Sequence, residues 1–392
     1  MPVRRPHLLF AAGLATACLL ATSAPAARSA GDPPLTVNPA SVRAAMHCPA
    51  TFSRPKTPAL LVHGTGSTAV ESWSHTLAKT LPADGHDVCT VDLPERALGD
   101  IQVAAQYVVV AIEDMAARAG RRVDVVGHSQ GGLEPRWALK WFPSTQALVD
   151  DYVALSSTEH GSLDAAGACA AGSCAPAVWQ QRPGSAFLTA LNRGDETPGD
   201  QVSYTSVYSL TDEIVPELPP PPTSMLAGAS NIAVQDICPA RPVNHVGMLT
   251  DPVGNALVLD ALDHPGPADP RRVPLSTCLL PYAPGLDAAD LVYEQAIGLG
   301  NAGVSTLVTG PMTNGEPPLA GYTSVAAATA AVSPPQPSAP PNADPAPQRP
   351  AQVKAARATL AATGGGANAT LLVVMVAIGL AGLAFCREGV AG

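Results

Sequence analysis

A serine at the centre of a Gly-x-Ser-x-Gly motif is the residue of this chain best suited to chemistry. The motif spans Gly127 to Gly131, with Ser129 at its centre. A mostly apolar, β-branched run at 123–126 precedes it, and a helix-compatible stretch follows at 133–141. In this strand–turn–helix context the motif predicts a nucleophile elbow, whose tight turn strains the serine backbone and exposes its hydroxyl. We expect glycine at both ends of the motif because a Cβ there would collide with the neighbouring strand or helix.

A serine nucleophile also needs donors for the oxyanion that forms during attack. The strand-like run 59–62 ends in His63-Gly64-Thr65-Gly66, and a loop of this type lies beside the elbow and lends backbone N–H groups. The backbone N–H of Gln130, directly after Ser129, supplies a second donor. We therefore predict an oxyanion hole formed by Thr65 and Gln130, with the Thr65 hydroxyl as a further hydrogen-bond donor. The alternative is that the two glycines only form a turn after the strand.

The general base is predicted from chain order, which runs serine, then acid, then histidine in this type of site. Three histidines follow Ser129. His160 comes too soon to follow an acid-bearing strand, and His264 lies in an Asp-His-Pro-Gly turn. This leaves His245 as the base that takes the proton of Ser129.

The orienting acid is predicted to follow a strand at 202–208, whose residues alternate in polarity. Asp212 comes just past this strand, where ligands gather in open α/β sheets. We favour Asp212 over Glu213 because it comes first and its shorter side chain suits an imidazole partner. An ordinary solvated loop carboxylate is the alternative. Such a triad requires no metal or organic cofactor.

Several segments, in the same order along the chain, resemble those of the Candida antarctica lipase B-like family of α/β-hydrolase lipases. The similarity covers roughly residues 38–322, and the matching segments are 60–66, 129–133, 176–181, 184–186, 208–215 and 315–317. The Val-Trp-Gln-Gln stretch at 178–181 is not part of general hydrolase chemistry and so identifies the family better than the elbow does. The resemblance implies an α/β-hydrolase fold with a mostly parallel sheet flanked by helices, and lipase or esterase activity on carboxylic esters.

Carried over residue by residue, the resemblance implies the same site as the chain order does. It assigns Ser129, Asp212 and His245 to the triad, and Thr65 with Gln130 to the oxyanion hole.

The chain also departs from the family at positions near the site. His128 stands where the family has a tryptophan, and Glu159 where it has an aspartate near the acyl pocket. We expect both to be substrate-pocket residues, with packing as the alternative for His128. Gly315 replaces a cysteine, so one family disulfide is missing.

Cysteine usage predicts an exported protein. Of eight cysteines, Cys18 lies in a candidate signal peptide and Cys386 in a terminal apolar segment, which leaves an even set of six. The resemblance implies the pairs Cys48–Cys89 and Cys238–Cys278, so that Cys169 and Cys174 close a small local loop. A metal site is not expected, because Cys169 and Cys174 have no second Cys or His pair at zinc spacing.

The ends of the chain predict four segments. Residues 1–26 have the pattern of a signal peptide, 27–330 form the hydrolase domain and 331–366 form a Pro/Ala/Gly-rich linker. Residues 367–392 are predicted to be an anchor with a short cytoplasmic tail. The uncharged run 369–386, at about 1.5 Å per residue, suffices for a C-terminal transmembrane helix. We expect the enzyme on the outer face of the cell membrane, with release by cleavage in the linker left open.

Composition excludes other partners. A net charge of −10 leaves no basic face for nucleic acid, and only 4% aromatic residues make base-stacking platforms improbable. We expect a monomeric, extracellular serine lipase or carboxylesterase that acts on small acylglycerol-type esters. An acyltransferase with the same triad and a non-catalytic cell-surface module are the alternatives, and the complete set of site residues argues against the latter.

Overall fold

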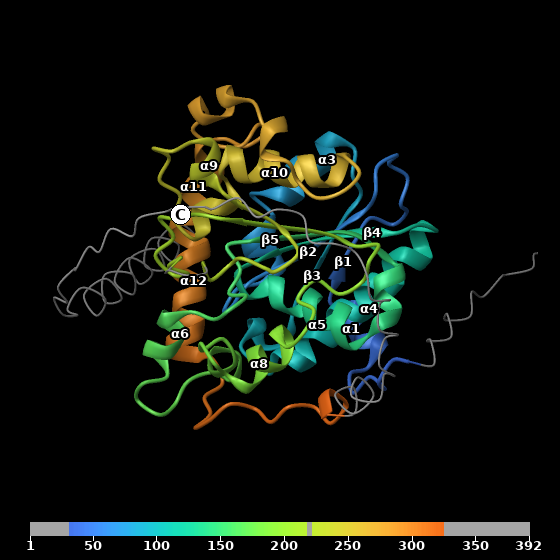
Figure 1. The fold of residues 1–392 in the computed structure, drawn as a ribbon, viewed down its shortest axis with the longest axis vertical. Coiled ribbons are helices and arrows are strands. Elements are labelled where there is room, and N and C mark those ends of the chain that lie inside the picture. Colours follow the sequence, from blue (N-terminus) through green and yellow to red (C-terminus); the bar gives the residue numbers. More distant parts are fainter. Residues whose placement is uncertain (1–30, 218–221, 325–392) are drawn as a thin grey trace, which may run out of the picture.

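A seven-stranded sheet forms the centre of the computed structural model, which describes residues 31–217 and 222–324 (Figure 1). The strand order is β1-β3-β2-β4-β5-β6-β7. The two-residue strand β1 pairs antiparallel with β3, and every other neighbouring pair is parallel, so the sheet is mixed. The strands are β1 (Met46–His47), β2 (Ala59–Val62), β3 (Val88–Val91), β4 (Val123–His128), β5 (Val149–Leu155), β6 (Ser203–Tyr208) and β7 (Ser230–Ala233).

Alternate side chains of the strands enter two separate hydrophobic cores, one on each face of the sheet. In β2, Leu60 and Val62 join the core on one face, whereas Ala59 and Leu61 join the other. All four are completely buried. This is the pattern of a parallel strand covered by helices on both faces, and it explains why β2 is a continuous apolar run.

Helices cover both faces (Figure 1). The first core contains residues of α4 (Ile101–Ala119), α5 (Leu133–Trp141) and α8 (Ala186–Asn192), and the second those of α2 (Ala69–Trp73), α3 (Leu77–Asp84) and α10 (Pro252–Asp263). The other α-helices are α1 (Pro39–Ala44), α6 (Leu163–Ala168), α7 (Pro176–Gln180), α9 (Val234–Ile237), α11 (Ala288–Tyr293) and α12 (Leu299–Val304).

One part of the predicted fold class is wrong, namely the C-terminal transmembrane helix. Within 31–217 and 222–324, no helix is both long and apolar enough to cross a membrane. The longest helix of this part, α4, carries Gln102, Gln106, Glu113 and Asp114 along its length and packs on the sheet. The segments expected to be the signal peptide, the linker and the anchor all lie outside the described residues.

Three disulfides join the pairs that the resemblance implies: Cys48–Cys89, Cys169–Cys174 and Cys238–Cys278. The first ties the segment after β1 to β3. The third ties the end of α9 to the segment after α10. The second closes a local loop between α6 and α7.

Candidate active site

Ser129 lies at a strained turn between β4 and α5. Its φ of +57° is in the left-handed region, which a non-glycine residue rarely adopts. The turn has no space for side chains at either glycine of the motif. A Cβ on Gly127 would lie 2.0 Å from the carbonyl oxygen of Gly131, and one on Gly131 would lie 2.2 Å from that of Val62 in β2. The collisions predicted from the sequence are therefore present, and they fix the serine at the carboxyl end of the sheet.

Asp212 and His245 form a buried pair next to this turn. The Nδ1 of His245 lies 2.9 Å from Oδ2 of Asp212, and both side chains are almost fully buried. The other oxygen of Asp212 accepts hydrogen bonds from the backbone N–H groups of Ile214 and Val215, at 2.9 and 2.8 Å. The carboxylate is thus held at the end of β6 by local backbone donors.

The pKa values of this pair shift in opposite directions. Burial disfavours the imidazolium of His245, but the neighbouring Asp212 carboxylate outweighs burial and raises the pKa of His245. Burial likewise disfavours the Asp212 carboxylate, but His245 and the backbone donors outweigh it and lower the pKa of Asp212. The pair therefore stabilises a positive charge on the imidazole.

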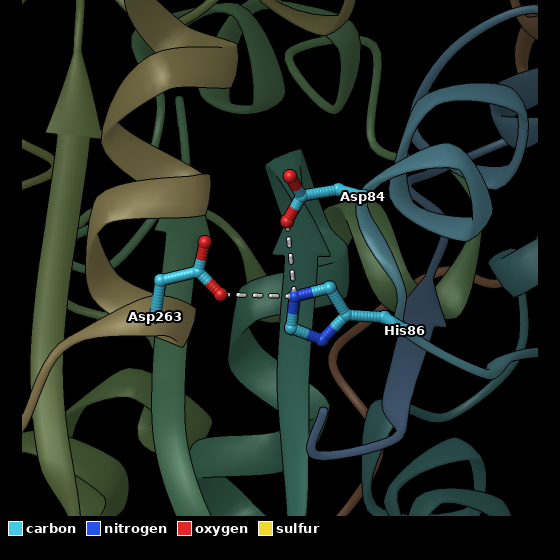
Figure 2. A group of neighbouring side chains, drawn as sticks. All are labelled: Asp84, His86 and Asp263. Carbon is cyan, nitrogen blue, oxygen red and sulfur yellow. Dashed lines mark ion pairs between the residues drawn. The ribbon is translucent and has the colours of Figure 1, made fainter. Parts of the chain in front are cut away.

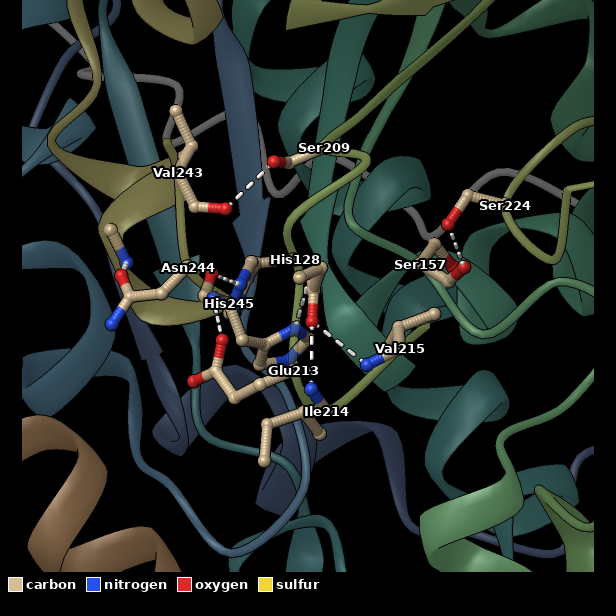
Figure 3. Close-up of polar contacts among 12 residues, drawn as sticks. His128, Ser157, Ser209, Glu213, Ile214, Val215, Ser224, Val243, Asn244 and His245 are labelled. Atoms are coloured by element: carbon tan, nitrogen blue, oxygen red, sulfur yellow. Dashed lines mark hydrogen bonds and ion pairs between the residues drawn. The ribbon is translucent and has the colours of Figure 1, made fainter. Parts of the chain in front are cut away.

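The backbone of His245 is held on both sides (Figure 3). Its N–H donates to Oε2 of Glu213 at 3.1 Å, and its carbonyl oxygen lies 3.1 Å from Nε2 of His128. Because a carbonyl oxygen only accepts, Nε2 of His128 carries the proton. Burial, aided by the charge of His245, lowers the pKa of His128 to about 3, so this histidine is neutral. His128 therefore contacts His245 as well as the cavity described below.

Thr65 and Gln130 are joined by a hydrogen-bond network that includes Gln181. The Thr65 hydroxyl donates to Oε1 of Gln130 at 2.6 Å, and Nε2 of Gln181 donates to both of these oxygens at 2.9 Å. The amide nitrogen of Gln130 donates to Oε1 of Glu134 at 2.8 Å. Burial raises the pKa of Glu134 to about 8. Each side-chain polar atom of Gln130 thus has a partner, which fixes the residue that follows Ser129.

One cavity of about 230 Å³ connects these residues. Ser129, His245, Thr65, His128 and Gln181 all line it. The remaining lining residues come from the loops after β2, β5 and β6, from α2, α6 and α7, from the turn after His245, and from the helical segment that contains α12. They are Gly64, Ser67, Glu71, Ser72, Thr158, Ser162, Asp164, Ala165, Ala168, Val178, Ile214, Val246, Leu249, Glu294, Gly300, Ala302, Gly303, Val304 and Thr306.

Glu159 does not line this cavity, although the resemblance implied a pocket role. Its carboxylate is fully buried against the Arg136 guanidinium, and it accepts a hydrogen bond of 2.7 Å from the Tyr152 hydroxyl. These contacts use both of its oxygens. The acid that lines the same cavity from α6 is Asp164 instead.

Three further residues lie at the site: Gln181, Glu213 and Glu294. From the sequence, Glu213 was weighed only as the alternative acid, and the other two were not singled out. Gln181 belongs to the Val-Trp-Gln-Gln stretch that carries the resemblance, which was a signal for it. Glu294 lines the cavity while 1% exposed, and its Oε1 has no hydrogen-bond partner among the described residues. Burial, with the charges of Asp290 and Glu71, raises its pKa to about 9. No sequence signal pointed to Glu294.

Two groups of side chains in the described part of the chain have the spacing to hold a metal ion. They are Asp84, His86 and Asp263, and Asp124, Asp150 and Asp151. Neither group includes a residue that lines the cavity.

The arrangement around Ser129 offers a hydroxyl, a paired imidazole and nearby hydrogen-bond donors, which are the groups that acyl transfer requires.

Comparison with known proteins finds lipases. A family model described as Lipase (class 2) matches residues 56–219. The lipase B of Pseudozyma antarctica is 34% identical over 323 residues, which cover 79% of this chain and 92% of that protein. The crystal structure of Aspergillus fumigatus lipase B aligns with a TM-score of 0.69 at 34% identity, covering 75% of this chain and 74% of that one.

Proposed function

The chain belongs to the lipase B family and is a hydrolase of the lipase class, and on that premise we propose that it cleaves carboxylic esters of the acylglycerol type outside the cell, through Ser129, His245 and Asp212. The observation that carries the proposal is the strained Ser129 in one cavity with His245, whose imidazole is paired at 2.9 Å with a buried carboxylate.

In the proposed mechanism the Ser129 Oγ attacks the ester carbonyl carbon and gives its proton to Nε2 of His245. The imidazolium that forms is stabilised by Asp212, which also keeps the other ring proton on Nδ1. His245 then returns a proton to the leaving alcohol. Water attacks the acyl-enzyme with His245 again as base, which releases the acid and restores Ser129.

The oxyanion is proposed to bind between Thr65 and the backbone N–H of Gln130. In the free enzyme the Thr65 hydroxyl donates to the side chain of Gln130, while Gln181 donates to the Thr65 oxygen. The bond from Gln181 holds the Thr65 hydroxyl oxygen in place. The Thr65 hydroxyl proton can therefore rotate toward the substrate without movement of that oxygen. Gln181 is thereby a positioning residue for the oxyanion hole.

The disulfides support a location outside the cell, because such bonds persist in oxidising compartments. Small residues, including Ala165, Ala168 and Ala302, line much of the cavity, which suits the apolar acyl chain of a lipid ester.

The test is hydrolysis of p-nitrophenyl esters from short to long acyl chains by the purified, disulfide-bonded protein and by Ser129→Ala. We expect the wild type to be active and the variant to have lost activity while retaining its unfolding transition. Activity that persists in Ser129→Ala refutes the proposal. Addition of an alcohol acceptor separates the acyltransferase alternative, because ester product formed faster than free acid would favour transfer over hydrolysis.

A further inference from the structure

A buried histidine and two carboxylates, shown in Figure 2, lie close together. They are at the opposite end of the parallel strands from Ser129. Asp84 is the last residue of α3 and His86 precedes β3, so both lie near the amino ends of the parallel strands. Asp263 ends α10. The three side chains therefore join the loop between α3 and β3 to the end of a helix far along the chain.

The hydrogen bonding of His86 fixes its tautomer. The side chain is fully buried, and Nδ1 lies 2.7 Å from the carbonyl oxygen of Thr57. A carbonyl only accepts, so the proton of the neutral ring is on Nδ1 and Nε2 carries a lone pair. Nε2 has no hydrogen-bond partner among the described residues. It points between Oδ2 of Asp84 at 3.5 Å and Oδ1 of Asp263 at 3.3 Å. In the neutral ring this lone pair faces two carboxylates, which is unfavourable unless a cation lies between them.

Lys56 neutralises the carboxylates in this structure but does not satisfy His86. Its Nζ contacts Oδ2 of Asp84 and lies 2.7 Å from Oδ2 of Asp263. The lysine side chain is 33% exposed. A flexible, partly exposed ammonium can leave for water at little cost, so Lys56 is a competitor for a cation at these carboxylates.

The two separations from Nε2 of His86 fit a tetrahedral metal ion. Donors that each lie about 2.0–2.1 Å from zinc are about 3.3–3.4 Å apart at tetrahedral angles. The two separations from Nε2 of His86 are 3.3 and 3.5 Å, close to this value. The bond from Nδ1–H to the Thr57 carbonyl is the outer contact that metal-bound histidines make.

We propose that Asp84, His86 and Asp263 bind Zn²⁺, which displaces Lys56 and takes water as its fourth ligand. The imidazole donor favours zinc over calcium or magnesium, which prefer oxygen ligands. The ion clamps the loop before β3 to the end of α10. The site lies away from the cavity at Ser129, so it stabilises the fold and takes no part in ester cleavage.

The test is thermal unfolding of the chelator-treated, dialysed protein as Zn²⁺ is added, with ester hydrolysis followed in parallel. We expect the wild-type Tm to rise by several degrees once Zn²⁺ is well above its Kd, because the ion binds only the folded site. Asp263→Asn and His86→Gln should lose this rise. Asp150→Asn, in the other acidic group, should keep it as the matched control.

The Lys56→Met variant should bind Zn²⁺ more tightly, a result that a misfolded variant would not give. Removal of the ammonium, which makes two partly exposed ion pairs, should increase Zn²⁺ affinity by up to about tenfold, measured by calorimetric titration, and enlarge the Tm rise. The proposal is overturned if Zn²⁺ leaves the Tm of wild type and Lys56→Met unchanged, which would make His86 an imidazolium paired with the two carboxylates. An equal rise in Asp263→Asn would also overturn it.

Discussion

Replacement of Asp212 by asparagine should lower kcat by about 10⁴, which corresponds to about 5.4 kcal/mol of transition-state stabilisation. The structure supplies the reason. Oδ2 of Asp212 lies 2.9 Å from Nδ1 of His245, and both groups are buried, so the ion pair formed with the imidazolium is little screened by water. Asparagine removes the charge and can present an N–H₂ group to Nδ1, which favours the wrong tautomer.

The same variant should shift the pH profile in a defined direction. His245 acts as base only when neutral, so activity falls as the pH drops through its pKa. Asp212 raises that pKa against the effect of burial. Loss of the carboxylate lowers it, and the acid limb of kcat/KM should therefore move to lower pH in Asp212→Asn, even as the plateau falls.

Glu213→Gln is the matched control. The Glu213 carboxylate accepts the backbone N–H of His245 at 3.1 Å, and the glutamine oxygen can accept the same bond. We expect less than about a tenfold loss. The assay is hydrolysis of a p-nitrophenyl ester from roughly pH 5 to pH 9. Near-full activity in Asp212→Asn, together with a large loss in Glu213→Gln, would show that the acid has been assigned to the wrong residue.

Three further variants probe the surroundings of the site. Thr65→Val should lower kcat by about 10²–10³ with little change in Tm, whereas Thr65→Ser should retain most activity; equal steady-state rates in both would exclude a role for the hydroxyl. Gly131→Ala should cost about 3 kcal/mol in urea unfolding, the upper end of the usual overpacking cost, because its Cβ would lie 2.2 Å from the carbonyl oxygen of Val62; an unchanged midpoint would contradict the close approach. Burial raises the folded-state pKa of Glu294 to about 9, well above its ordinary value. Between the ordinary pKa and the folded-state pKa, the folded state binds a proton that the unfolded state lacks, so the free energy of unfolding falls as the pH rises. Glu294→Gln should remove that dependence, and its stability gain over wild type should grow from about pH 6 to about pH 9; a gain that is constant with pH would refute the buried acid.

Local signals in the sequence predicted the elements that carry the site. The apolar run 59–62 coincides with β2, and the stretch 133–141 coincides with α5. The apolar spacing of Val108, Ala111, Ile112 and Met115 predicts a helix at 104–119. In the structure this helix, α4, begins earlier, at Ile101, because the Asp100 side chain caps it by accepting the N–H of Gln102. The apolar spacing used for the prediction does not report on such a cap.

Contacts between distant segments could not be predicted in the same way. Glu159 was expected at the substrate pocket because it stands where the family has an aspartate, yet it pairs with the buried cation of Arg136 and does not line the cavity. The cluster around His86 depends on Asp263, and only the packing of α10 against the sheet brings that residue near. The uncharged terminal run suggested a membrane span by composition alone, and no helix of the described chain supports it.

The most direct test of the account is covalent trapping of the nucleophile. The protein would be incubated with a p-nitrophenyl alkylphosphonate, and the modified residue located by peptide mass mapping. We predict one adduct per chain, on Ser129, formed in step with the loss of esterase activity and absent from Ser129→Ala. Inactivation with the adduct on another residue, or full activity after Ser129 is modified, would contradict the central claim.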